Sequence, residues 1–145
     1  MDKYTVPQCF IRLSNIENSA MFIGKYELNM DAKRRLPMPA KMREGLGKTV
    51  VITRGLDQCL FVYTQAAWAE FSEKLNRLPM SQTSARNFAR LLFSGAVEAD
   101  LDALGRALVP EYLADHAGLK KQAVVIGAGA RLEIWDKGRW DSYQM

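Results

Sequence analysis

Residues 31–35 read DAKRR and residues 102–106 read DALGR, so the chain contains two Asp-x-x-x-Arg pentapeptides at an offset of 71. The agreement extends well beyond the pentapeptides. Other residues matching at this offset are Gly24 and Gly95, Pro39 and Pro110, and Gly47 and Gly118, while Trp68 and Trp140 match at 72. An ordered series of matches at one offset predicts an internal repeat of a single supersecondary unit.

Each pentapeptide lies between two segments with the pattern of extended strands. Before the first one, alternation places Tyr26, Leu28 and Met30 on one face of a half-buried strand. The LPMP stretch after it is also extended, because proline fixes φ and moves the preceding residue toward β geometry. We therefore predict a bend at residues 31–35, followed by a short helix at 40–47 and strands at TVVIT and CLFVY.

The second half repeats this order, and helical spacing of apolar residues fills the segment between the copies. It predicts a strand at 96–101, a bend at 102–106, a helix at 111–118 and strands at AVVIG and RLEIW. Apolar residues three or four apart predict two packing helices, at 65–76 and 81–93. These elements indicate an α+β fold in which the helices lie between and around two β units.

The repeat also predicts the organisation of the chain. We expect a first repeat unit at 21–68, a helical connector at 69–94, a second repeat unit at 95–141 and a C-terminal tail at 142–145. Residues 1–20 have no counterpart elsewhere in the chain. We expect them to be a mobile N-terminal extension, and the alternative is an extra strand packed on the body.

The charge of the chain favours an anionic partner. The formal net charge is +4, with 20 Lys and Arg against 16 Asp and Glu. Residues 31–54 contain seven basic and two acidic residues, whereas residues 102–125 contain three of each. Positive charge is therefore concentrated around the first pentapeptide, which is typical of a face that binds a polyanion.

Other function classes find little support in the sequence. The single histidine, His116, has no nucleophile in a recognisable context, and the carboxylates of Asp31 and Asp102 are each held ionised by an arginine four residues later. Cys9 and Cys59 form no Cys-x-x-Cys pair, and GAGAR at 127–131 lies between two strands, as a hairpin does. We expect no enzyme, metal, cofactor or small-molecule substrate, and no membrane partner, because no apolar run approaches the length of a membrane span. The paucity of cysteine is typical of a reducing cytoplasm.

The pentapeptide has the properties of a rigid cationic loop. An Asp that opens a bend can accept hydrogen bonds from backbone N–H groups two or three residues later, which fixes the shape of the loop. The Arg that closes the bend is then held in place, and its guanidinium can contact phosphates or bind guanine O6 and N7 bidentately. An Asp–Arg ion pair without any ligand is the alternative that the loop alone leaves open.

Several segments together resemble the MraZ family of bacterial transcription regulators. They are MFIGKYELNMDAKRRLPMPAK, TRGLDQCLFVY, LLFSGAVEADLDALGRALVP and LEIWD, in this order from Met21 nearly to the C-terminus. The resemblance implies two AbrB-like swapped-hairpin units whose strands interleave in one shared, barrel-like core. It also implies a homo-oligomeric ring, commonly an octamer, that binds double-stranded DNA at short direct repeats upstream of the division and cell-wall gene cluster, usually including its own promoter.

The resemblance assigns DNA recognition to the two loops. It carries over to Arg35 and Arg106 as DNA-binding residues, with Lys33 also matching the first motif, and to Asp31 and Asp102 as the residues that organise the loops. The family usually has glycine at the fourth position, as here at Gly105, but the first loop has Arg34. Glycine reaches left-handed backbone angles freely, so this loop either uses a different turn or accepts strain and gains a charge.

We accordingly predict a cytoplasmic, nucleoid-associated regulator, with Lys33, Arg34 and Arg35 together on the principal DNA-contacting tip. The runner-up is an oligomeric interaction protein whose basic face docks an acidic partner or binds polyanions without sequence preference.

Overall fold

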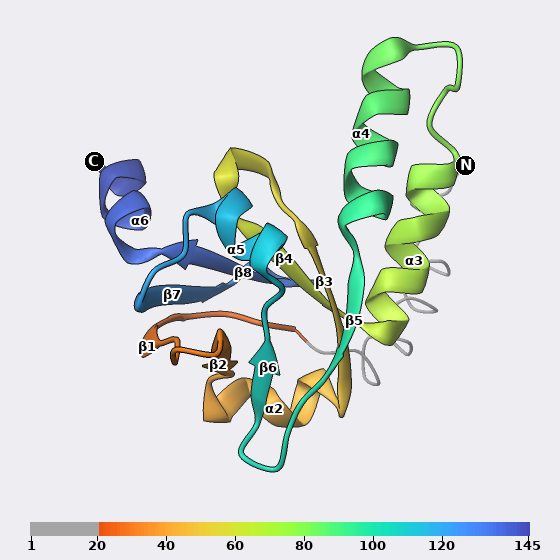
Figure 1. Ribbon diagram of the computed structural model, residues 1–145. Helices are drawn as coiled ribbons and strands as arrows, with labels where there is room; N and C mark the ends of the chain where they lie inside the picture. The colour runs from red at the N-terminus through yellow and green to blue at the C-terminus, as the bar shows by residue number, and fades with distance from the viewer. Residues whose placement is uncertain (1–20) are drawn as a thin grey trace.

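The two halves of the chain share one antiparallel sheet. The computed structural model describes residues 21–145, so the extension predicted at 1–20 lies outside the described residues. Six strands are hydrogen-bonded in the order β1-β7-β8-β4-β3-β5 (Figure 1). They are β1 (Lys25–Asn29), β7 (Gln122–Gly127), β8 (Leu132–Asp136), β4 (Leu60–Thr64), β3 (Thr49–Arg54) and β5 (Val97–Asp100). In the repeat β1, β7 and β8 correspond to β5, β3 and β4, so the order is symmetric about the β8–β4 pair.

A separate ribbon of two short strands carries the ends of both pentapeptides. β2 (Arg35–Pro37) pairs antiparallel with β6 (Arg106–Leu108), and each strand comes from a different half. Pro37 and Pro39 have no N–H group to donate, which limits the pairing that this part of the chain can make. The prediction of a barrel-like shared core is not confirmed, because the six-stranded sheet is open and has β1 and β5 at its edges.

Within residues 21–145, five α-helices surround the strands, and all but α4 form equivalent pairs in the repeat. α2 (Ala40–Leu46) and α5 (Glu111–Ala117) follow the ribbon strands, and both begin directly after a proline, which suits the first turn of a helix. α3 (Gln65–Asn76) and α4 (Thr83–Gly95) form a hairpin that projects from the sheet at the right of Figure 1. α6 (Lys137–Gln144) ends the chain and includes most of the segment expected as a tail.

Apolar residues from both halves make the core. The larger cluster is built on strands, on α2 and on α5, and includes the fully buried Leu36, Ile52, Val109 and Ile134. A smaller cluster lies around Tyr63 and Trp135, against α3 and α6. β4 contributes to both clusters, because alternate residues of a strand point to opposite faces of a sheet. No helix within residues 21–145 is long and apolar enough to cross a membrane.

Candidate nucleic-acid interface

The first pentapeptide is a tight loop organised by one carboxylate. Asp31 Oδ1 accepts hydrogen bonds from the backbone N–H groups of Lys33 at 2.9 Å and Arg35 at 2.8 Å. The other oxygen, Oδ2, accepts from Arg35 Nε at 2.7 Å. The Asp31 N–H also donates to the Arg35 carbonyl at 3.0 Å. Both ends of the loop are thus tied to one side chain, and the Arg35 side chain is held in place by it.

The second pentapeptide has the same geometry, bond for bond. Asp102 Oδ1 accepts from the N–H groups of Leu104 at 2.9 Å and Arg106 at 2.8 Å, and Oδ2 accepts from Arg106 Nε at 2.7 Å. The Asp102 N–H donates to the Arg106 carbonyl at 3.0 Å. The loop shape predicted from Asp-x-x-x-Arg is therefore confirmed in both copies, although the residues between Asp and Arg differ.

The same hydrogen bonds keep both carboxylates ionised. The Arg35 N–H bond is the main reason that the pKa of Asp31 lies below its ordinary value, and the Arg35 guanidinium adds to the effect. The Arg106 N–H bond and guanidinium lower the pKa of Asp102 in the same way. Each loop therefore keeps an ionised Asp–Arg pair at neutral pH, in a surface position.

The fourth residue of each loop has a left-handed backbone conformation, including Arg34 of the first loop. Gly105 has φ of 76° and Arg34 has φ of 61°, so both loops use the same turn. A left-handed conformation costs a residue with a side chain about 1–2 kcal/mol, so Arg34 carries strain that Gly105 avoids. The Arg34 Nε group donates to the carbonyl of Val109 at 3.0 Å, in the other half of the chain.

The ribbon brings the two loops onto one surface. β2 and β6 begin with Arg35 and Arg106, and their register pairs Arg35 with Leu108 and Arg106 with Pro37. Arg106 Nη1 lies 3.9 Å from Asp31 Oδ2, so the second arginine also feels the carboxylate of the first loop. The structure thus brings together Asp31, Arg35, Asp102 and Arg106.

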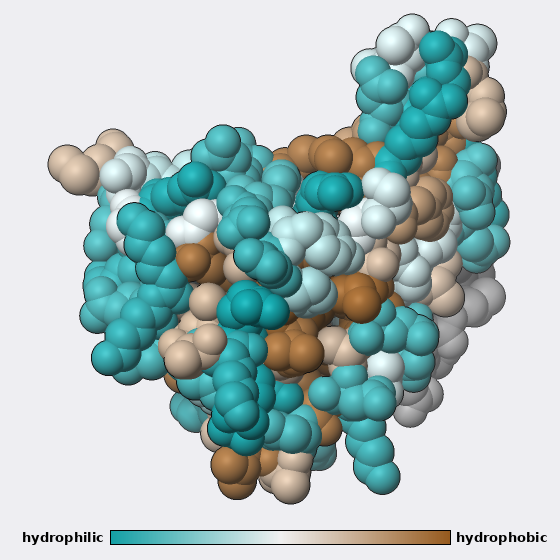
Figure 2. All heavy atoms as spheres, in the orientation of Figure 1, coloured by the Kyte–Doolittle hydropathy of each residue, from teal (hydrophilic) through white to brown (hydrophobic). Residues whose placement is uncertain are grey.

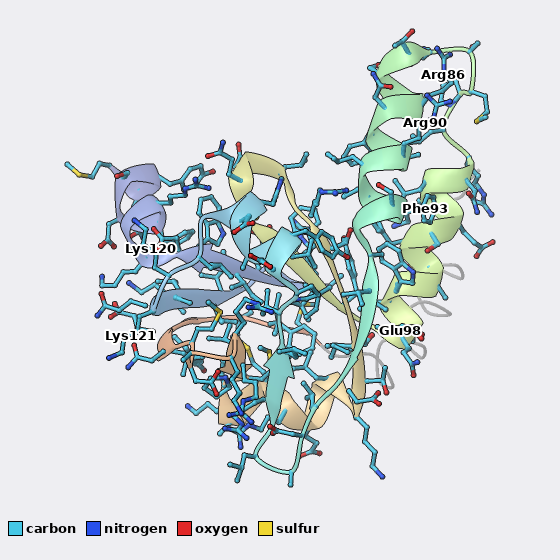
Figure 3. The ribbon with its side chains drawn as sticks, viewed as in Figure 1. Arg86, Arg90, Phe93, Glu98, Lys120 and Lys121 are labelled. Carbon is cyan, nitrogen blue, oxygen red and sulfur yellow. The ribbon has the colours of Figure 1, made fainter. Side chains whose placement is uncertain are left out.

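Three cations of the predicted tip differ in how they are held. The Lys33 side chain is exposed and Arg35 is bound by Asp31, whereas the guanidinium of Arg34 is engaged with Val109. In Figure 2 hydrophilic residues lie above the bend between β5 and β6, with hydrophobic residues at the lower end of the bend, and in Figure 3 nitrogen-rich side chains gather beside β2 and β6. DNA contact by Lys33, Arg34, Arg35 and Arg106 stays a prediction.

Each loop also has an exposed lysine beside it that comes from the opposite half. The N–H of Met30, next to the first loop, donates to the Lys121 carbonyl at 2.7 Å, and the N–H of Leu101, next to the second, donates to the Lys48 carbonyl at 2.8 Å. Lys120 and Lys121 lie just before β7 (Figure 3). Their charge is evident from the sequence, but their position beside the loops is not, because each lysine reaches the loop of the opposite half only in the folded chain. The available signal was a lysine immediately before β3 and before β7.

Residues that catalytic or metal chemistry would use lie away from the loops. His116 Nε2 is 3.3 Å from the Gly55 carbonyl and the imidazole is half-buried. Cys59 is buried with a free thiol, and burial raises its pKa to about 12. Within residues 21–145, no three His, Cys, Asp or Glu side chains form a group that could hold a metal ion. GAGAR joins β7 to β8, and the hairpin predicted there is confirmed.

Both halves of the chain match one known family. The sequence model described as "MraZ protein, putative antitoxin-like" matches residues 21–91 and again residues 92–145. The chain belongs to the MraZ family. One loop lies in each matched segment, so the pseudo-symmetric loops are a feature of two MraZ units in one chain. The finer boundaries at 68, 94 and 141 stay a prediction.

Curated relatives agree with this assignment over almost their whole length. A protein of Heliobacterium modesticaldum named "Transcriptional regulator MraZ" is 52% identical over 123 residues, which are 85% of this chain and 86% of the relative. Proteins of the same name from Desulforamulus reducens and Acetivibrio thermocellus are 50% and 45% identical over 123 residues, which cover 85% of this chain and 87% and 86% of the relatives.

Proposed function

We propose that this MraZ-family protein is a DNA-binding transcriptional regulator that reads DNA with its two Asp-x-x-x-Arg loops. The observation that carries the proposal is the identical geometry of the loops, each of which holds an arginine by Nε against an ionised aspartate. Nε is then occupied, and the terminal amino groups of the guanidinium remain to bind phosphate or a guanine edge. The names of the relatives support the regulatory role.

The arrangement of the cations supports phosphate contacts around the loops. Lys33 is exposed on the first loop, and Lys48 and Lys121 are exposed beside the second and the first. Ammonium groups bind phosphates without sequence preference, so we assign them to affinity and assign base reading to Arg35 and Arg106. The relevant DNA is the set of short direct repeats that the family resemblance implies, upstream of the division and cell-wall genes and of the protein's own gene. We accordingly propose that the protein acts in the cytoplasm, associated with the nucleoid.

We propose that the regulator acts as a homo-oligomer in which α6 of one copy docks beside α4 of the next. Two equivalent aromatic triads support this arrangement, at an offset of 72: Tyr63, Trp68 and Phe71, and Trp135, Trp140 and Tyr143. Both are compact, with Tyr63–Phe71 and Trp135–Tyr143 centroid distances of 4.9 Å. α4 covers the first triad through Phe93, whose ring centroid lies 6.0 Å from that of Trp68.

The second triad has no helix equivalent to α4 packed on it within residues 21–145. Tyr143 is 61% exposed. On the other side of the proposed contact, an open groove of about 550 Å³ separates α3 from α4, and its apolar walls include Leu75, Met80 and Phe93. Figure 3 shows Arg86, Arg90 and Phe93 along α4, which bounds this groove. Because the two surfaces differ, repeated docking generates a ring where the rotation closes, and engagement of several copies raises avidity for repeated sites.

Footprinting tests the regulatory proposal directly. The full chain is applied to the DNA immediately upstream of its own gene, and protection of regularly spaced short repeats is the expected result. A parallel salt titration on this DNA and on a scrambled copy decides against the rival function. Steep salt dependence with equal affinity for both sequences would favour polyanion binding or docking of an acidic protein.

Light scattering tests the oligomer separately. Phe93→Glu and Tyr143→Glu place a charge on either side of the proposed contact and are expected to reduce the mass of the assembly, whereas Tyr143→Phe keeps it. An unchanged mass for both glutamate variants would refute the α4–α6 contact without bearing on DNA recognition.

A further inference from the structure

The ends of the β2–β6 ribbon are two equivalent residue pairs. Val109 donates its N–H to the Arg34 carbonyl at 2.8 Å, and Met38 donates its N–H to the Gly105 carbonyl at 2.9 Å. The equivalence follows from the repeat, because 34 and 105, like 38 and 109, are 71 residues apart. Each pair joins the fourth residue of one loop to the residue just beyond the ribbon strand of the other half.

An ordinary antiparallel pair would return a second backbone hydrogen bond, but here none is available. The Arg34 N–H already donates to the Asp31 carbonyl at 3.0 Å, and the Gly105 N–H donates to the Asp102 carbonyl at 2.8 Å. The carbonyls of Val109 and Met38 therefore need another donor. Both residues are fully buried, at 0% exposure, and a buried carbonyl without a partner is costly.

Two different arginines supply the missing bond at the two ends. Arg34 Nε donates to the Val109 carbonyl at 3.0 Å, and Arg43 Nε donates to the Met38 carbonyl at 2.9 Å. Arg34 is the fourth residue of the first loop itself, whereas Arg43 belongs to α2. The same bond is thus made from a loop at one end and from a helix at the other.

At one end of the ribbon, a side chain on the fourth loop residue and the side chain of the helix arginine would compete for the same space. A Cβ atom built on Gly105 would come within 2.7 Å of Arg43 Cδ and even closer to Arg43 Nε, so the Arg43 side chain occupies the space that a side chain at 105 would need. At the first loop, where residue 34 has a side chain, the position equivalent to Arg43 is Ala114, 71 residues further along. At the end of the first loop the chain therefore combines Arg34 with Ala114. At the end of the second loop it combines Gly105 with Arg43.

We infer that Arg34 and Arg43 are equivalent positioning residues. Each donates the hydrogen bond that a buried carbonyl at one end of the ribbon needs, and so fixes one loop against the opposite half of the chain. Arg34 therefore acts within the protein, and its left-handed strain is compensated by this bond. The consequence for DNA rests on the proposed function: Arg35 directly follows Arg34, so a loosened end displaces the arginine that reads the DNA.

Lysine variants separate positioning from direct DNA contact. Arg34→Lys and Arg43→Lys keep the charge but remove the Nε donor near the backbone, since a lysine donates only from the end of its stem. In hydrogen exchange of the DNA-free full chain, we expect the segments around residues 33–38 and 105–110 to exchange about tenfold faster in both variants, which is the size of one lost charge-assisted bond. Fluorescence anisotropy with the protein's own promoter DNA should show a loss of affinity of a similar size in Arg34→Lys.

A compensating variant provides the matched control. Arg34→Gly should loosen the first loop, and Arg34→Gly with Ala114→Arg should restore slow exchange, because it rebuilds at this end the glycine and arginine found at the other. Exchange at the wild-type rate in both lysine variants would overturn the inference. A loss of DNA affinity in Arg34→Lys with unchanged exchange would also overturn it, because Arg34 would then contact the DNA directly. A wild-type chain that binds no promoter DNA would refute the proposed function, while the exchange data would still decide the positioning role.

Discussion

Replacing Arg35 by alanine should abolish most sequence-specific DNA binding while leaving the protein folded. The variant removes the guanidinium whose Nε lies 2.7 Å from Asp31 Oδ2. The two side chains are 37% and 35% exposed, so solvent screens this ion pair and its loss should change the free energy of unfolding little. The backbone N–H bonds to Asp31 involve no side chain of residue 35, so the loop itself should persist.

The loss of binding should be much larger than the loss of stability. One bidentate contact between arginine and guanine is worth about 1–3 kcal/mol, or about 5- to 150-fold in affinity for each engaged loop. The variant also leaves the Asp31 carboxylate without the arginine of its own loop, on the surface proposed to face DNA and with Arg106 Nη1 3.9 Å away, which adds repulsion. The slope of log affinity against log salt should fall by about one for each lost phosphate contact.

Fluorescence anisotropy with promoter and scrambled DNA measures the effect, and light scattering confirms that the assembly is intact. The matched control is Arg77→Ala, which removes another arginine four residues after an acidic partner: Arg77 Nη2 lies 3.6 Å from Glu73 Oε1, at the end of α3 and outside the loops. This control should bind promoter DNA like the wild type. If Arg35→Ala in a correctly assembled protein bound with unchanged affinity, the assignment of base reading to this loop would be refuted.

Three further predictions concern the same surface. Arg106→Ala should reduce promoter affinity less than Arg35→Ala in the same assay, because residues 102–125 carry as many acidic as basic residues. Gly105→Ala should lower the free energy of unfolding by about 1–3 kcal/mol, because φ is 76° and the Arg43 side chain occupies the space that the new Cβ needs. The control is Gly129→Ala, where φ is 82° but no atom lies within 4 Å of the Cβ position, so its loss of stability in thermal unfolding should be smaller. The pKa values of Asp31 and Asp102 are lowered in the folded protein, so each ionised carboxylate stabilises its loop fully when the pH is above the unfolded pKa of about 4. This stabilisation is lost as the pH falls through the lower pKa of the folded state. The loop carboxylates should therefore leave affinity unchanged between pH 5 and 8, whereas a midpoint for loop opening above pH 5 in hydrogen exchange would contradict the assigned bonds.

Most elements were predictable because their signals are local. Alternating apolar residues located β1 and β5, and proline followed by helix-forming residues located α2 and α5. α6 was not predicted, because it is only eight residues long and includes Gly138, which weakens the helical signal. In the structure the Asp136 side chain accepts from the Arg139 N–H at 3.2 Å, which is the bond expected of an N-cap.

The shape of the two loops is encoded locally in the amino-acid sequence. Every hydrogen bond that defines them joins residues within four positions of each other, so Asp-x-x-x-Arg specifies the same geometry in both copies whatever lies between. The repeat likewise indicated that corresponding elements would recur, because equivalent local patterns favour equivalent local structure.

The surroundings of the loops, in contrast, depend on how distant segments of the chain come together. The open sheet, the placing of Lys121 beside the first loop and the bond from Arg34 to a carbonyl 75 residues away all depend on which distant strands pair. Strand pairing is settled by the burial of a shared core and by the satisfaction of buried backbone groups, which are properties of the whole chain. For that reason DAKRR reads in the sequence as three adjacent cations, and only the folded chain separates exposed Lys33 from Arg35, held by Asp31, and Arg34, held by Val109.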